Sequence, residues 1–330
     1  MDEALRKEYE EWVEKVQREL VNHKEWVEQY GNYAKNMMEH KDLFIKARKT
    51  FHVYKPLHAY LTIGNVKDKH VNFDLRYLGQ SVGTIKVGAR KRKPRLSVNE
   101  TQANNSERFN YRLGIIENKS WSTSELAKAF RTFYKNEAVG SPRQEEHMVE
   151  SALFSELEKT KSVNKTLCGI QPVSYANSRI HMKTSLKASD AKKNVIEQSK
   201  TGGETDILCR RNIKLGESRF VVIEVKDENK KNESFDDTMK QAISYAVFIS
   251  ELIHSNAGKD WMKIWGMENQ IKENYIIDCV VAMPKGATEP SYAGEKIEIP
   301  GTGDKLELHY MKIKDYDSEN VEFESSFDNK

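Results

Sequence analysis

Charged side chains stand inside and beside two apolar runs between Gly202 and Glu228. The second run, RFVVIEVK, carries Glu224 and Lys226 two positions apart. The first run, TDILCRR, has Asp206 at its start. Because buried charge is costly unless it is paired or binds a metal, these three residues are the first candidates for chemistry.

The side chains of an extended RFVVIEVK segment alternate between two faces. Glu224 and Lys226 then share one face, and an apolar layer lies on the other. If the two runs pair as a hairpin, Asp206 lies beside Glu224. Two close carboxylates repel unless a cation lies between them, and oxygen ligands suit Mg²⁺ or Mn²⁺. A nearby lysine can orient or deprotonate a water, so the set suits metal-assisted hydrolysis of a phosphodiester.

The order of these residues resembles the signature of the PD-(D/E)XK nuclease superfamily, which has a restriction-endonuclease-like fold. Asp206 precedes a hairpin and then Glu224-Val225-Lys226. The following segment QAISY is similar to the QxxxY element of RecB-like members, and GGETD is similar to their glycine-rich approach to the metal aspartate. The resemblance covers about residues 143–313. It departs from the pattern at Thr205, where many members have proline.

The resemblance implies a role for each matching residue. Asp206 and Glu224 would bind Mg²⁺, or Mn²⁺ in its place, with the main-chain carbonyl of Val225. Lys226 would position the attacking water and stabilise the transition state. The catalytic lysine or the substrate phosphate would be oriented by the two residues of the QxxxY element, Gln241 and Tyr245.

The family also adds an acid from the first core helix. The sequence offers four candidates there: Glu145, Glu146, Glu150 and Glu156. Glu146 and Glu150 share a helix face with Leu153 and Leu157, so they can point toward the edge of the sheet. Glu150 is the preferred fourth catalytic and metal-binding residue.

The predicted fold class is α/β: a restriction-endonuclease-like mixed sheet flanked by helices, preceded by an α+β N-terminal region. Gly140 and Pro142 predict a boundary between residues 1–140, a recognition or partner region, and residues 141–330, the nuclease domain. Periodicity in the second part predicts helices over 143–159 and 234–253, a loop over 177–201, and strands over 165–175, 205–211, 219–226, 274–284 and 305–313.

The first part reads as a long helix followed by strands and a second helix. The helix is expected over residues 2–48, interrupted or bent at Gly31. Strands follow within 51–64, 70–79 and 81–88. Ser122 and Glu125 have the spacing of a capping box for a helix over 122–137. Whether the first helix also forms a homodimer, or binds a partner subunit, is left open.

Basic residues gather after the third of these strands, although the formal net charge is only +3. They could contact phosphates without reading sequence, and a solvated surface is the plain alternative. The expected partner is nucleic acid, with DNA favoured because the superfamily acts mostly on DNA. The candidate contacts are Arg90, Lys91, Arg92, Lys93 and Arg95.

Other features narrow the class of protein. No apolar run approaches the length of a membrane span, and the N-terminus does not read as a secretory signal. Three separated cysteines form no CxxC pair, which indicates buried thiols in a reducing cytoplasm. The nine histidines show no metal-like spacing, and no Walker-type loop supports ATP use.

The function predicted from sequence is therefore a metal-dependent nuclease, with DNA as the favoured substrate and restriction or defence as the expected setting. Two alternatives stay open: a catalytically silent nucleic-acid-binding or assembly module on the same fold, and an RNA-directed nuclease. Taken singly, Glu224 and Lys226 could also be a simple ion pair at the edge of a sheet. The sequence does not separate endonuclease from exonuclease action.

Overall fold

The computed structural model describes residues 1–64, 70–88, 93–112, 114–142, 146–162, 169–226, 234–268, 270, 273–284, 287–314 and 321–327. The chain forms two compact units, each discontinuous in sequence. Unit 1 comprises Met1–Ala34, Ala152–Val173 and Met182–Lys330, and unit 2 comprises Lys35–Ser151 and Ser174–His181. This grouping differs from a single boundary at residue 140, because the first helix packs on the C-terminal part of the chain.

Unit 1 is built on a mixed sheet with the order β14-β15-β13-β12-β11-β6, and β16 pairs with β15 as well. Its strands β12, β13 and β15 are parallel, and the pairs β12–β11, β11–β6, β15–β14 and β15–β16 are antiparallel. The bounds are β6 (Ile170–Pro172), β11 (Ile207–Lys214), β12 (Glu217–Val225), β13 (Ile276–Pro284), β14 (Lys296–Glu298), β15 (Lys305–Lys314) and β16 (Glu322–Ser325). The continuous Val and Ile runs of β12 and β13 fit strands that are buried on both faces. The strands predicted at 205–211, 219–226, 274–284 and 305–313 are confirmed.

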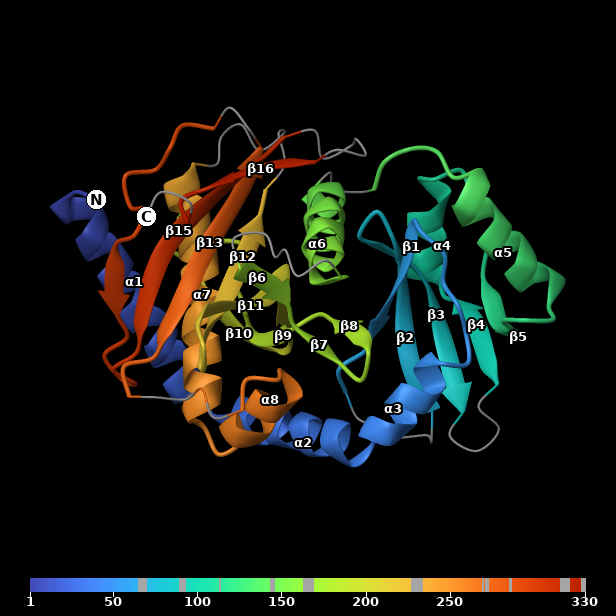
Figure 1. The fold of residues 1–330 in the computed structure, drawn as a ribbon, viewed down its shortest axis with the longest axis horizontal. Helices are drawn as coiled ribbons and strands as arrows, with labels where there is room; N and C mark the ends of the chain where they lie inside the picture. The colour runs from blue at the N-terminus through green and yellow to red at the C-terminus, as the bar shows by residue number, and fades with distance from the viewer. Residues whose placement is uncertain are drawn as a thin grey trace. The chain divides into compact units, whose positions relative to one another are not determined.

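Helix α7 (Phe235–His254) lies against one face of this sheet, and α1 (Glu3–Asn22) packs on α7 (Figure 1). Ser234 caps α7 by accepting from Asp237 N at 3.1 Å. The helix is covered on several sides, which explains why it is apolar around much of its circumference. The short helix α8 (Gly258–Ile264) follows and packs on α7.

The stretch 177–201, predicted as a loop, contains strands, so that prediction is wrong. β8 (Ser178–Ile180) joins the sheet of unit 2, while β9 (Lys183–Lys187) and β10 (Glu197–Glu204) form a two-stranded sheet in unit 1. β9 buries small polar residues, Thr184 and Ser185. The apolar alternation that would reveal a strand is therefore weak.

The first predicted helix is in fact three helices. They are α1, α2 (Glu25–Glu39) and α3 (Lys41–Arg48). The first break falls at His23, whose φ of −130° and ψ of 73° are not helical. Gly31 does not bend the chain and lies inside α2, where a Cβ would sit 3.9 Å from the Cβ of Ala257.

Unit 2 contains a sheet in the order β5-β4-β3-β2-β1-β8-β7. Neighbouring strands are antiparallel except β1 and β8, which are parallel. The bounds are β1 (Leu57–Leu61), β2 (His70–Tyr77), β3 (Gln80–Gly88), β4 (Pro94–Val98), β5 (Ile116–Ser120), β7 (Ser174–Tyr175) and β8. The three strands predicted within 51–88 are confirmed.

Helices α4 (Glu100–Glu107) and α5 (Glu125–Asn136) also belong to unit 2. Helix α5 was predicted, but its N-cap is Ser124, not Ser122. The capping box of this unit lies instead on α4, between Asn99 and Gln102. Helix α6 (Glu146–Ser162) contributes its first six residues to unit 2 and the rest to unit 1.

The described chain is thus a mixed α/β protein. None of its described helices combines the length and the apolar character needed to cross a membrane.

Candidate metal centre

The hairpin of β11 and β12 brings two of the predicted acids together. Ile207 pairs with Ile223 in the antiparallel register, so Asp206 and Glu224 follow as the next opposed pair. A carboxylate oxygen of Asp206 lies within 4.8 Å of one of Glu224. The predicted hairpin and its juxtaposition of acids are confirmed.

Asp206 is held by the main chain of the opposite strand. Its Oδ2 accepts a hydrogen bond of 2.8 Å from the N–H of Val225. This bond fixes one oxygen of a half-buried carboxylate at the point where the β11–β12 ladder ends. This hydrogen bond joins two predicted metal ligands, because the carbonyl of Val225 and the carboxylate of Asp206 were both expected to bind the ion.

Glu224 and Lys226 form a buried ion pair on the same strand. The Lys226 ammonium is 2.8 Å from Glu224 Oε1, and the two residues are only 5% and 1% exposed. The N–H of Lys226 donates to Ala282 O at 2.9 Å, which anchors the lysine on β13. This pair is not the exposed edge pair considered as the plain alternative, because a buried pair carries a desolvation cost that such exposed pairs avoid.

Helix α7 faces this corner with Tyr245 and Gln241, one turn apart. Burial raises the pKa of the Tyr245 hydroxyl, and the charges of Glu224 and Asp206 raise it further. A side-chain hydrogen bond with Gln241 acts in the opposite direction. The hydroxyl therefore stays protonated and can act as a hydrogen-bond donor beside the acids.

Glycines let β10 approach the same corner. Gly202 has φ +62°, a region that favours glycine. A Cβ on Gly203 would lie 2.5 Å from Leu186 O and 3.3 Å from the Tyr245 hydroxyl. The GGETD segment thus needs its glycines for close packing beside the candidate centre.

The candidate acids of α6 lie in different units. Glu150 belongs to unit 2 and is 4% exposed, with His181 Nε2 at 3.3 Å and His147 Nδ1 at 3.6 Å. Glu146, the first residue of α6, also belongs to unit 2, while the half-buried Glu156 belongs to unit 1. Glu145 lies outside the described residues.

Part of the predicted nucleic-acid contact falls on described residues of unit 2. Lys93 and Arg95 are exposed, and Arg95 donates to Asn118 O at 2.9 Å. Arg95 also pairs across β3 and β4 with the exposed Lys86. The remaining predicted contacts lie outside the described residues: Arg90, Lys91 and Arg92.

Unit 1 holds a second acidic cluster that the sequence did not single out. Asp278, Glu307 and His309 each offer a ligand atom, and these atoms lie within 4.8 Å of one another. All three residues are buried. They sit at alternate positions in the apolar runs of β13 and β15, the same kind of signal that drew attention to Glu224.

Comparisons with known proteins supply no relative. No family model, no curated protein and no solved structure matches this chain.

Proposed function

We propose that this protein is a metal-dependent nuclease that hydrolyses phosphodiester bonds, with DNA as the favoured substrate. The observation that carries the proposal is the corner of unit 1 where Asp206 and Glu224 meet beside the Lys226 ammonium. A buried amine paired to one of two adjacent acids suits phosphate chemistry better than it suits stability, since such pairs seldom add net stability.

The donor atoms of this corner fit a hard divalent cation. Two carboxylates on adjoining strands offer oxygen ligands, which Mg²⁺ and Mn²⁺ prefer. Asp206 and Glu224 would hold the ion with the carbonyl of Val225. When bound, the ion would polarise a phosphate oxygen and lower the pKa of a water.

The chain's own side chains would then divide the remaining tasks. Lys226 is proposed to orient the attacking water and to offset negative charge on the phosphate. Its ammonium is already held 2.8 Å from Glu224, so little ordering is needed on substrate binding. Gln241 and the neutral Tyr245 hydroxyl would orient Lys226 or donate hydrogen bonds to the substrate phosphate.

The exposed basic residues of β3 and β4 support nucleic acid as the partner. Lys86 and Arg95 are direct cross-strand neighbours, and like charges so placed are destabilising. Lys93 adds a further exposed charge beside them. An anionic backbone would relieve this repulsion, and such contacts would be independent of sequence.

The test is a cleavage assay on plasmid, single-stranded DNA and RNA with Mg²⁺, Mn²⁺ or EDTA. Asp206→Asn and Lys226→Met should each abolish metal-dependent cleavage. Glu204→Gln is the matched control, because it removes an equal charge from an exposed residue two positions from Asp206. Cleavage that survives Asp206→Asn would disprove the assignment.

Two other outcomes would redirect the proposal. Binding of DNA without cleavage under every metal would favour a silent nucleic-acid-binding module. Cleavage of RNA alone would change the substrate class and leave the site intact.

A further inference from the structure

We propose that Asp278, Glu307 and His309 form a second metal site in unit 1, which takes a divalent transition-metal ion such as Zn²⁺. The proposal is independent of the nuclease assignment. It rests on three ligand atoms that converge in the core and on the state of the His309 ring.

The parallel register of β13 and β15 creates the site. Asp278 pairs with Glu307, and His309 is two residues further along the same strand, so all three side chains share one face of the sheet. They are 0%, 1% and 1% exposed, respectively. His309 Nε2 lies 3.7 Å from Asp278 Oδ1 and 3.6 Å from Glu307 Oε1.

Those separations exceed hydrogen-bonding distance. Within the part of the chain that the structure describes, His309 Nε2 has no hydrogen-bond partner. A buried polar nitrogen aimed at two carboxylates without a bond is costly. Four-coordinate zinc, with bonds of about 2.0–2.1 Å, holds its ligand atoms about 3.3–3.4 Å apart, so His309 Nε2 needs to approach each of the two oxygens by only a few tenths of an ångström.

The other ring nitrogen has a partner that can accept the proton of the tautomer needed for metal binding. His309 Nδ1 is 3.0 Å from Ser326 Oγ, and that hydroxyl can donate to Tyr310 O at 3.5 Å. In the tautomer with its proton on Nδ1, Nδ1–H donates to Ser326 Oγ, and the lone pair of Nε2 faces the two acids. A histidine ligand with its second nitrogen held in this way is the usual arrangement at metal sites.

Arginines bind both carboxylates of this cluster. Arg211 Nη2 is 2.8 Å from Asp278 Oδ2, and Arg219 Nη1 is 2.8 Å from Glu307 Oε2. Arg219 Nη1 also lies 3.3 Å from Asp278 Oδ1. Burial lowers the pKa of Arg219, but Asp278 and Glu307 raise it more, so the guanidinium stays charged. The contacts to Oδ2 and Oε2 hold the two carboxylates in place, as outer hydrogen bonds do around metal ligands, while Arg219 also donates to Oδ1 and would share that oxygen with the ion.

The nature of the ligands selects the class of ion. One imidazole with two carboxylates suits Zn²⁺ or a similar transition metal better than Mg²⁺. The nearby arginines would weaken binding of any cation, so a strongly bound transition metal fits better than a weakly bound hard ion. Three protein ligands leave a fourth position for water.

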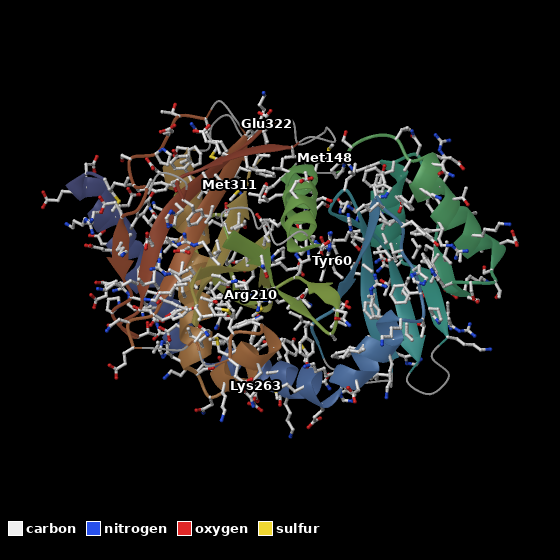
Figure 2. All side chains as sticks on the ribbon, viewed as in Figure 1. Tyr60, Met148, Arg210, Lys263, Met311 and Glu322 are labelled. Carbon is white, nitrogen blue, oxygen red and sulfur yellow. The ribbon has the colours of Figure 1, made fainter. Side chains whose placement is uncertain are left out.

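The C-terminal segment closes over this cluster. Phe327 stacks on the His309 ring at 4.0 Å between centroids, and Arg211 covers Phe327 at 4.2 Å. Met311 on β15 and Glu322 on β16, both labelled in Figure 2, mark the two strands that carry His309 and lead to Ser326. A bound ion would therefore fasten the last described residues, through His309, to the central sheet.

The test is a Co²⁺ and Zn²⁺ titration of the full chain, stripped of metal and kept in excess Mg²⁺. Wild type and Asp206→Asn should each bind one equivalent of Co²⁺ or Zn²⁺ at the second site. His309→Gln should weaken binding at least about 100-fold, the upper end of the loss caused by an outer-shell partner alone. His147→Gln is the matched control, since His147 also lies 3.6 Å from a glutamate.

Absence of stoichiometric binding by wild type, or unchanged binding by His309→Gln, would overturn the proposal and leave an ion-pair network. If His309→Gln does not fold, X-ray absorption spectroscopy of zinc bound to the wild type identifies the ligands instead. One imidazole among oxygen ligands is expected. Oxygen ligands alone, or two or more imidazoles, would contradict the assignment.

Discussion

Two acidic clusters occupy opposite faces of the same sheet in unit 1, and they differ in what neutralises them. At the end of β12, Asp206 and Glu224 have one lysine ammonium and a backbone N–H. Across the sheet, Asp278 and Glu307 have two arginine guanidinium groups and an imidazole nearby, and the Lys296 ammonium lies 3.5 Å from Glu307 Oε2. The register shows the opposition of faces: Val221 pairs with Asp278, whereas Glu224 pairs with Val281.

The comparison shows how carboxylates in one sheet can serve two different purposes, depending on their burial and on the cations around them. Asp206 is half-buried, whereas Asp278, Glu307 and His309 are all fully buried. Arginine forks fix the geometry of a carboxylate more firmly than lysine, which is a mobile point charge. The lysine cluster is therefore suited to chemistry, and the arginine cluster to holding structure or an ion.

The largest expected effect separates the clusters by activity. Lys226→Met should lower cleavage about 10²–10⁴-fold, the range for loss of a positioned proton-transfer group, and His309→Gln should leave the rate within about twofold. Initial rates on plasmid with Mg²⁺ measure both. Equal losses of cleavage rate in Lys226→Met and His309→Gln would mean that catalysis does not depend on the first cluster alone.

The second prediction concerns stability, where substitution in the second cluster should have the larger effect. Asp278→Asn replaces the charged partner of Arg211 by a neutral amide, while Arg219 keeps Glu307. Because the arginine charge of this buried pair is then uncompensated, the free energy of unfolding should fall by about 3–5 kcal/mol. Asp206→Asn keeps an oxygen for the Val225 N–H and should change it by less than about 0.5 kcal/mol. Urea denaturation of both variants gives the values. A comparable loss for Asp206→Asn would make the first cluster structural as well.

The sequence predicted the first cluster because its evidence is local. A hairpin of two apolar runs fixes the register, so the meeting of Asp206 and Glu224 follows from about 20 residues. The second cluster depends on parallel pairing of β13 with β15, and the register of strands joined by a long crossover cannot be read from either strand. His309 therefore looked like one of nine scattered histidines.

The same reasoning explains where the predicted and the observed fold differ. Polar, short strands such as β9 and β10 lack the alternation that marks a half-buried strand. The grouping of the first 34 residues with unit 1 depends on the packing of α1 against α7, which is a long-range contact. Elements with long apolar runs, β12, β13 and α7 among them, were predicted correctly.

The third prediction uses metals to tell the clusters apart. Zn²⁺ at about 100 times its Kd should raise the free energy of unfolding by about 2.7 kcal/mol in wild type and in Asp206→Asn, but not in His309→Gln. Excess Mg²⁺ during the measurement saturates oxygen sites. Urea denaturation with and without Zn²⁺ measures the gain. A gain that disappears in Asp206→Asn would move the zinc effect to the first cluster.

The smallest expected effect concerns the tyrosine that faces the first cluster. Tyr245→Phe removes a neutral hydroxyl near Glu224 and Asp206 but keeps the buried ring, which is 4% exposed. One hydrogen bond contributes about 1 kcal/mol, so cleavage should fall about fivefold while the free energy of unfolding stays within about 1 kcal/mol. Steady-state rates and urea denaturation provide the two readings. Since this hydroxyl stays protonated above neutral pH, the loss should be the same at pH 7 and pH 9. A loss that grows with pH would show instead that Tyr245 ionises, and that its surroundings at the first cluster are more exposed to water than the packing of α7 indicates.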